Sequence, residues 1–122
     1  MRNMSFALTT QQVQDHSKDV TRRLGWLHLK QGEAFQPVKK CMGLRPGEKI
    51  ERIGGAVVTV STRREPLRRM TDDQEYGRDE CRREGFPRLS PAEFVAMFCA
   101  SHRGCRPESI VTRIEFSYEV RP

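Results

Sequence analysis

The stretch Ile110-Val-Thr-Arg-Ile-Glu-Phe-Ser-Tyr-Glu-Val120 decides the fold class of this chain, because two sets of residues alternate along it. Alternation with a period of two is typical of a strand that buries one face. We therefore expect a strand over this stretch, with the more apolar set inside. The apolar set is Ile110, Ile114, Phe116, Tyr118 and Val120, and the other set is Val111, Arg113, Glu115, Ser117 and Glu119.

Three more segments before this stretch indicate strands. The β-branched run Ala56-Val-Val-Thr-Val60 predicts a central strand buried on both faces, which Pro66 ends or bends. A turn at Gln31-Gly32-Glu33 precedes a strand at Ala34–Val38. A further strand begins within Ser5–Leu8.

Helices are expected between these strands. Ser90-Pro-Ala-Glu93 has a serine at the N-cap, a proline at N1 and a glutamate at N3, which predicts a helix start. Thr9 or Thr10 caps a short helix over Gln11–His16, with a glutamine completing a capping box. Thr71–Arg83 favours a solvated helix that opens on a similar box. Strands separated by short helices indicate an α+β fold rather than regular βαβ winding.

Composition predicts a single domain, residues 1–122, with a basic surface. Apolar residues make up 36% of the chain, which supports a modest core. Lysine and arginine outnumber aspartate and glutamate by 22 to 16, which gives a net charge of +6. Such a surface favours polyanions, although surplus charge also serves solubility alone.

The chain offers no export or membrane signal. Met1-Arg-Asn-Met4 has no apolar h-region, and no apolar run approaches the roughly 18 to 20 residues that cross a bilayer. We expect a cytoplasmic protein with no membrane contact and with reduced cysteines. Zinc at Cys99-x-x-His102-x-x-Cys105, with Cys81, is a weak alternative because the spacings differ from paired Cys-x-x-Cys sites. We therefore expect no metal and no cofactor.

Basic and aromatic residues suggest contacts to nucleic acid. The turn-rich segment 42–49 carries Arg45 and follows Lys39 and Lys40, so this loop could hold phosphates. Trp26 and Phe86 can each stack on a base or fill the core, and the sequence leaves both readings open.

The segment Lys18-Asp-Val-Thr-Arg-Arg23 carries the residues best suited to chemistry. A neutral Lys18 could take the proton of the Thr21 hydroxyl as that hydroxyl attacks an acyl carbon. Arg23 could then hold an anionic substrate, and Glu84 is the natural distant acid. The alternative is structural: Thr21 caps a turn, the two basic residues are solvated, and Glu84 pairs with an arginine.

The spacing Lys18-x-x-Thr21-x-Arg23 resembles the signature of ASCH domains, named for activating signal cointegrator homology. The resemblance extends over nearly the whole chain. It includes the Trp26 segment, the Gly32 turn, Gly43–Glu48, the central valine strand, Glu84-Gly-Phe-Pro87 and Val111–Phe116. It implies a PUA-like small β-barrel with flanking short helices, which binds RNA or a nucleotide beside the signature loop.

One bacterial branch of that family removes acetyl from N4-acetylcytidine, and the resemblance assigns its catalytic lysine, threonine and glutamate to Lys18, Thr21 and Glu84. The Trp26 segment and the longer loop around Arg45 depart from that compact enzyme. Our first hypothesis is therefore a protein that binds RNA or a nucleotide or nucleoside, and the alternative is the amidohydrolase. Protein partners stay open, and the binding residues we expect are Arg22, Arg23, Trp26, Lys39, Lys40 and Arg45.

Overall fold

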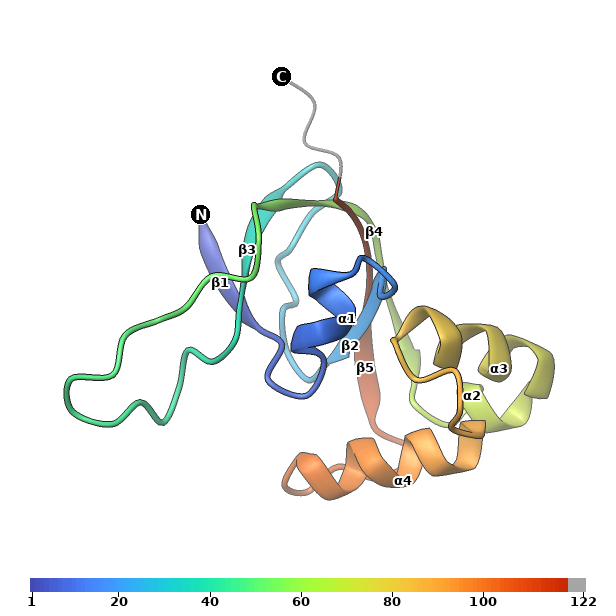
Figure 1. Ribbon diagram of the computed structural model, residues 1–122. Coiled ribbons are helices and arrows are strands. Elements are labelled where there is room, and N and C mark those ends of the chain that lie inside the picture. Colours follow the sequence, from blue (N-terminus) through green and yellow to red (C-terminus); the bar gives the residue numbers. More distant parts are fainter. Residues whose placement is uncertain (119–122) are drawn as a thin grey trace.

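The computed structural model describes residues 1–118, so Glu119 and Val120 of the expected last strand lie outside the described residues. Strands and helices alternate irregularly along the chain, as an α+β fold requires (Figure 1). In chain order the elements are β1 (Arg2–Ser5), α1 (Thr10–Gln14), β2 (Val20–Arg23), β3 (Ala34–Val38), β4 (Val57–Pro66), α2 (Arg69–Asp72), α3 (Gln74–Arg83), α4 (Pro91–Ser101) and β5 (Ile110–Ser117).

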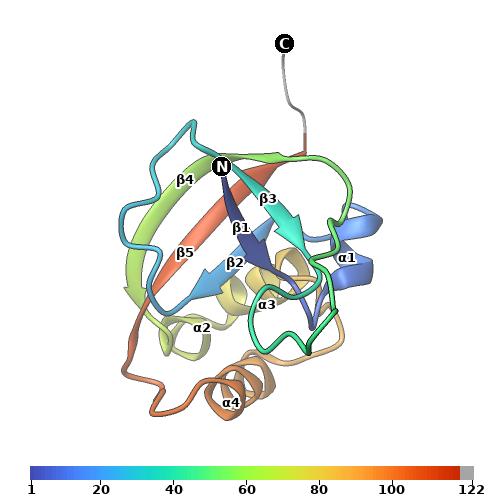
Figure 2. The same ribbon diagram turned by 90° about the vertical axis from the view of Figure 1, so that its left-hand side faces the viewer.

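The strands form one curved sheet in the order β1-β3-β4-β5-β2. β1 runs parallel to β3, and the other neighbours are antiparallel. Figure 2 shows β4 and β5 as long strands that bend across the molecule. The α+β class is confirmed, but the small β-barrel that the resemblance implies is not closed, because within residues 1–118 no ladder joins the edge strands β1 and β2. Val13 of α1, the helix that connects these two strands, packs into the core with Met4 instead.

Strand β5 lies between two hydrophobic clusters. Ile114 and Phe116 join one cluster, in which Phe6 and Phe35 also pack. Val111 joins a second cluster with side chains of α2, α3 and α4. The expectation of one buried face is therefore wrong for this strand. The helices that cover the other face bury Val111 and Arg113, while Ile110 at the end of the strand is 47% exposed.

Strand β4 is central in the sheet and ends at Pro66, as expected. It is not buried on both faces, however. Val57 and Thr59 are buried, whereas Val60 is 38% exposed, so the strand alternates. The helices lie over the later part of the sheet, toward β5, and this leaves the outer face at the start of β4 open (Figure 1).

The N-caps of the helices test the capping boxes that the sequence predicts. At α4 the Ser90 side chain accepts from the Glu93 backbone N–H, and the Glu93 side chain accepts from Ser90, so the predicted capping box is confirmed. At α1 the N-cap Thr9 makes no side-chain cap bond, and the box predicted there is wrong. The α3 cap is Asp73, and this helix is not fully solvated because Glu80 is buried.

None of the helices in residues 1–118 is long and apolar enough to span a membrane. The loop between β3 and β4, residues 39–56, projects from the sheet in Figure 1. It carries most of the basic residues that we expected to contact phosphates.

Candidate functional site

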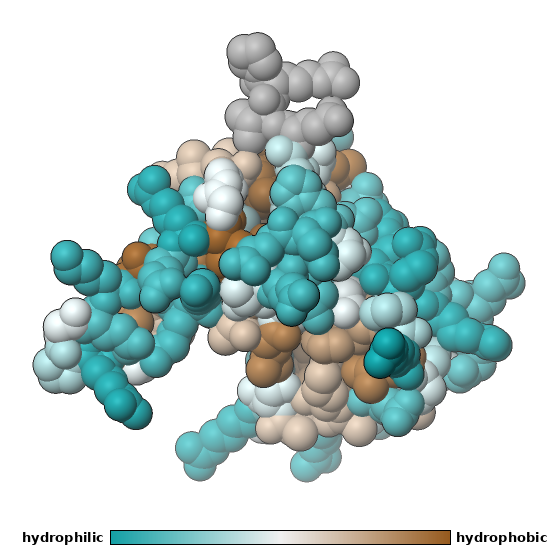
Figure 3. Space-filling view, in the orientation of Figure 1, coloured by the Kyte–Doolittle hydropathy of each residue, from teal (hydrophilic) through white to brown (hydrophobic). Residues whose placement is uncertain are grey.

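A pocket of about 340 Å³ opens beside the edge strand β2, between the turn that follows β1 and helix α4. On the face shown in Figure 3, apolar residues gather between α1 and α4, with hydrophilic residues around them. The lining combines charged side chains with an aromatic wall. It comprises Ser5, Phe6, Ala7, Leu8, Thr9, Lys18, Thr21, Arg22, Arg23, Glu84, Phe86, Phe94, Met97, Phe98, Ser101 and His102.

Contacts between α1 and the segment after α3 hold the polar end of this pocket. The Gln12 amide donates to the Gly85 carbonyl, and the Lys18 N–H donates to the Gln12 carbonyl. Gly85 has φ +96°, and a Cβ there would lie 2.9 Å from the Gln12 side chain. A glycine is needed at this position both for its backbone angle and for the close approach. These contacts bring Lys18 next to Glu84, 66 residues later in the chain.

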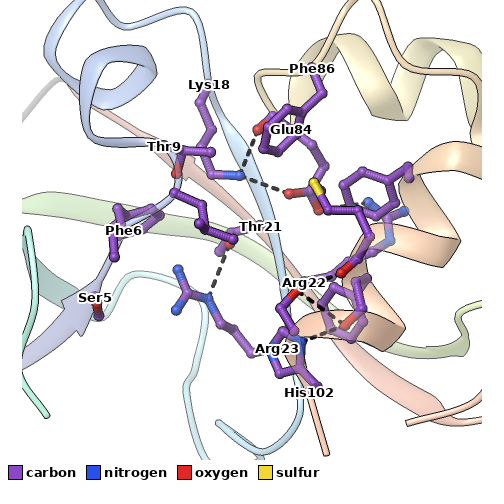
Figure 4. A pocket seen from close by; sticks show the side chains of 16 residues that line it. Ser5, Phe6, Thr9, Lys18, Thr21, Arg22, Arg23, Glu84, Phe86 and His102 are labelled. Carbon is purple, nitrogen blue, oxygen red and sulfur yellow. Dashed lines mark hydrogen bonds and ion pairs between the residues drawn. The ribbon is translucent and has the colours of Figure 1, made fainter. Parts of the chain in front are cut away.

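Lys18 and Glu84 form a buried ion pair. The Lys18 Nζ donates to Glu84 Oε1 at 2.7 Å and to the Glu84 carbonyl at 2.8 Å (Figure 4). Burial lowers the pKa of Lys18, and this effect outweighs the Glu84 charge, which raises it. The charges of Arg23 and Arg22 lower the same pKa further. Lys18 is therefore easier to deprotonate than an exposed lysine.

Arg22 lies behind this pair, with its side chain fully buried. Its guanidinium donates to Glu84 Oε2 at 3.0 Å and also bonds Glu80 on α3. Arg113 bonds the same Glu80 through two nitrogens. Burial lowers the pKa of Arg22, but Glu84 and Glu80 raise it by more. Arg22 thus fixes Glu84, and its role in binding a ligand stays a prediction.

Thr21 and Arg23 present their side chains at the pocket beside this ion pair (Figure 4). The Arg23 Nε donates to the Thr21 Oγ1 at 3.1 Å, so this bond leaves the hydroxyl proton for another acceptor. The Arg23 guanidinium lies 4.7 Å from the centre of the Phe6 ring. Burial lowers the pKa of Arg23 by more than the Glu84 charge raises it, and the net pKa is about 10, so Arg23 remains charged at neutral pH.

Phe86, one of the two aromatic residues considered for stacking on a base, lines the apolar wall of the pocket, but the part of this wall that α4 supplies was not predicted. Phe94 and Phe98 of α4 line it, and His102 stacks on Phe98 with ring centres 4.0 Å apart. These three residues are spaced i, i+4 and i+8, which places them on one helical face. That spacing could have been found in the sequence. The His102 Nδ1 lies 2.8 Å from the Phe98 carbonyl oxygen, so it carries the proton and the Nε2 is an acceptor in the neutral ring.

Other predicted binding residues lie outside the pocket lining. Trp26 packs against the core, with the Arg2 guanidinium 3.9 Å from its ring centre, so the core reading fits better than an open stacking platform. On the projecting loop, Lys39 pairs with Glu51 and Lys40 with Glu48. The structure brings Lys18, Thr21, Arg22, Arg23 and Glu84 together, and it leaves Trp26, Lys39, Lys40 and Arg45 apart from them.

The cysteines are free thiols, as their four Sγ atoms form no disulfide. Cys99 and Cys105 lie near one another, with 3.7 Å between the sulfurs. His102 does not complete a metal site with them, and residues 1–118 contain no cluster of three or more His, Cys, Asp or Glu side chains that could hold a metal ion.

Fold and site together define an α+β domain with an open, curved five-stranded sheet and a polar pocket at its edge. This chain is similar in fold to the crystal structure of protein EF3133 from Enterococcus faecalis V583, described with the family model DUF984. The TM-score is 0.53 and the identity 12%, over 94% of this chain and 77% of that one. No protein-family model matches the sequence, and no curated protein matches it.

Proposed function

We propose that this protein is an ASCH-type domain that binds RNA, or a nucleotide or nucleoside, in the pocket beside Lys18 to Arg23. The observation that carries this proposal is the convergence of hydrogen-bond donors at one end of a cavity whose other wall is largely aromatic. Lys18, Thr21 and Arg23 all supply donors there. Ligand pockets generally combine such a small polar set with apolar walls, and about 340 Å³ lies at the small end of their range.

The aromatic wall suits a nucleobase. Phe86, Phe98 and His102 line the pocket, and bases stack on such rings with little dependence on sequence. A pocket of this size accepts one nucleotide unit rather than a length of strand. In an RNA ligand, Arg45 and its basic neighbours on the projecting loop would hold phosphates on either side of that unit.

Isothermal titration with nucleosides, nucleotides and short single-stranded RNA tests the proposal. We expect at least one of these ligands to bind, and Lys18→Met to weaken that binding by about 10-fold to 100-fold, the size of a charge-assisted hydrogen bond. Lys30→Met is the matched control, because Lys30 is exposed and lies outside the pocket lining. Absence of binding by every ligand, or equal loss in both variants, would refute the proposal.

A second candidate is hydrolysis of an acylated cytidine such as N4-acetylcytidine, and the burial of Lys18 favours it. A neutral Lys18 would accept the Thr21 proton as the hydroxyl oxygen attacks the acetyl carbon, the cytosine amine would leave protonated, and water would release acetate. Against this, Lys18 donates to Glu84, and no Lys18–Thr21 hydrogen bond occurs within the described part of the chain.

Chromatography of N4-acetylcytidine incubated with the protein separates the two candidates. Catalysis predicts release of cytidine that Thr21→Val abolishes in a folded protein. Binding alone predicts that N4-acetylcytidine stays intact while ligand affinity remains measurable.

A further inference from the structure

The Arg23 guanidinium is a cation in the pocket that no carboxylate within residues 1–118 contacts directly. Among the residues that line the pocket, Lys18, Arg22 and Arg23 are cationic and Glu84 is the acid. Lys18 occupies one oxygen of the Glu84 carboxylate, and Arg22 occupies the other. The side-chain hydrogen bond described for Arg23 goes to the neutral Thr21 hydroxyl.

Arg23 is half-buried. A guanidinium that is partly removed from water without a counter-ion costs free energy, and proteins normally pair it. Arg22 shows how this chain pairs a buried arginine, since carboxylates from Glu84 and Glu80 bond it directly. Over residues 1–118, Arg23 forms no ion pair of this kind, and Glu84 acts on it only at longer range. The described residues therefore leave the charge of Arg23 without a directly bonded counter-ion, which an anionic ligand could provide.

Contacts with Phe6 and Thr21 orient the Arg23 guanidinium and determine which of its nitrogens can bind a ligand. One face of the guanidinium lies over the Phe6 ring, and the Nε is held by Thr21. Within the described part of the chain, the two terminal nitrogens make no hydrogen bond, and they form a planar fork. Such a fork matches the oxygens of a phosphate through parallel hydrogen bonds.

We infer that Arg23 is the phosphate-binding residue of this pocket and that its ligand is a free nucleoside monophosphate rather than a neutral nucleoside. This inference rests on the proposed function and specifies the ligand class of the same site. The lining carries one uncompensated cation next to a wall of aromatic rings, which suits one phosphate attached to one base. The Thr21 hydroxyl and the third hydrogen of a protonated Lys18 are further donors for the phosphate oxygens.

Paired titrations test the inference. Each of the four ribonucleosides is compared with its 5′-monophosphate by isothermal titration, and inorganic phosphate is added as a competitor. We expect one monophosphate to bind at least about tenfold more tightly than its nucleoside, as charge-assisted hydrogen bonds require. Inorganic phosphate should compete with it. Equal affinity for the two members of every pair, or tighter binding of the nucleosides, would overturn the inference while leaving the proposed function intact.

Variants then locate the phosphate. Arg23→Gln should bring the affinity for the monophosphate down to that for the nucleoside, and Arg23→Lys should restore part of the difference because it keeps the charge but not the fork. Arg64→Gln is the matched control, since Arg64 is exposed on β4 and outside the lining. If Arg23→Gln still binds the monophosphate more tightly than the nucleoside, then Arg23 is not the residue that binds the phosphate. Binding of short RNA without binding of any nucleoside or monophosphate contradicts the free-nucleotide ligand. If Arg23→Gln does not fold, the wild-type comparison still decides between the two ligand classes.

Discussion

Replacing Glu80 with glutamine should strongly destabilise the fold, because this carboxylate holds two buried arginines together. Glu80 is 1% exposed and bonds both Arg22 and Arg113. Removing the charge of one partner in a buried pair typically costs about 3–5 kcal/mol, since the other charge remains buried. We expect a loss of this size in the free energy of unfolding of Glu80→Gln at pH 7.

The pH dependence gives an independent measure of the same interaction. Burial raises the pKa of the Glu80 carboxyl, but the hydrogen bonds and charges of Arg113 and Arg22 lower it overall, from 4.5 to about 2. The stabilisation is therefore complete above pH 4.5 and is lost as the pH falls toward 2. A shift of this size corresponds to about 3 kcal/mol, in agreement with the figure for the glutamine variant.

Urea denaturation followed by circular dichroism, at pH 7 and at several values down to about pH 2, measures both quantities. Glu75→Gln is the control, because Glu75 is an exposed glutamate in the first turn of the same helix. It should change the free energy of unfolding by no more than about 0.5 kcal/mol. The reasoning is refuted if Glu80→Gln costs less than about 1 kcal/mol, or if its stability falls with acid as steeply as that of the wild type.

Two other predictions concern packing and the thiols. Gly77→Ala should lower the free energy of unfolding by about 1–3 kcal/mol or more, because the new Cβ would lie 1.9 Å from a backbone carbonyl oxygen of α2. Gly55→Ala is the control, since a Cβ there meets nothing within 4 Å. Equal denaturation midpoints for the two variants would contradict this prediction. The sulfurs of Cys99 and Cys105 are 3.7 Å apart, so excess oxidised glutathione should join them, with release of two glutathione thiols. Peptide mass mapping should find these two cysteines linked; disulfides through the other two cysteines instead would count against the geometry.

The family resemblance proposed from the sequence grouped residues into one predicted site that local sequence patterns could not connect. Lys18 and Glu84 are 66 positions apart, and tertiary contacts place them 2.7 Å from each other: Gln12 bonds Gly85, and Asp19 bonds Arg83. The role of Arg22 was missed for a different reason. Alternation along a strand puts Thr21 and Arg23 on one face and Arg22 on the other, but the strand itself was not recognised in this short polar segment.

Sequence patterns by themselves determined the α+β class, the strands at Ala34–Val38 and Ile110–Ser117, and the start of α4 at Ser90. Each of these depends on neighbours within a few residues, such as a turn, an alternation or a capping box, so local information suffices.

Only the tertiary structure decided whether the sheet closes, which faces of β4 and β5 are buried, and which side chains Arg22 and Arg23 contact. These properties depend on which elements pack on each side of the sheet. Helices α2 to α4 bury the outer face of β5 and supply Glu80 to Arg22 and Arg113. On the other side of β2, Arg23 faces the pocket with a neutral partner. Two adjacent arginines, alike in sequence, thus differ because one meets the carboxylates of a helix and the other meets the cavity.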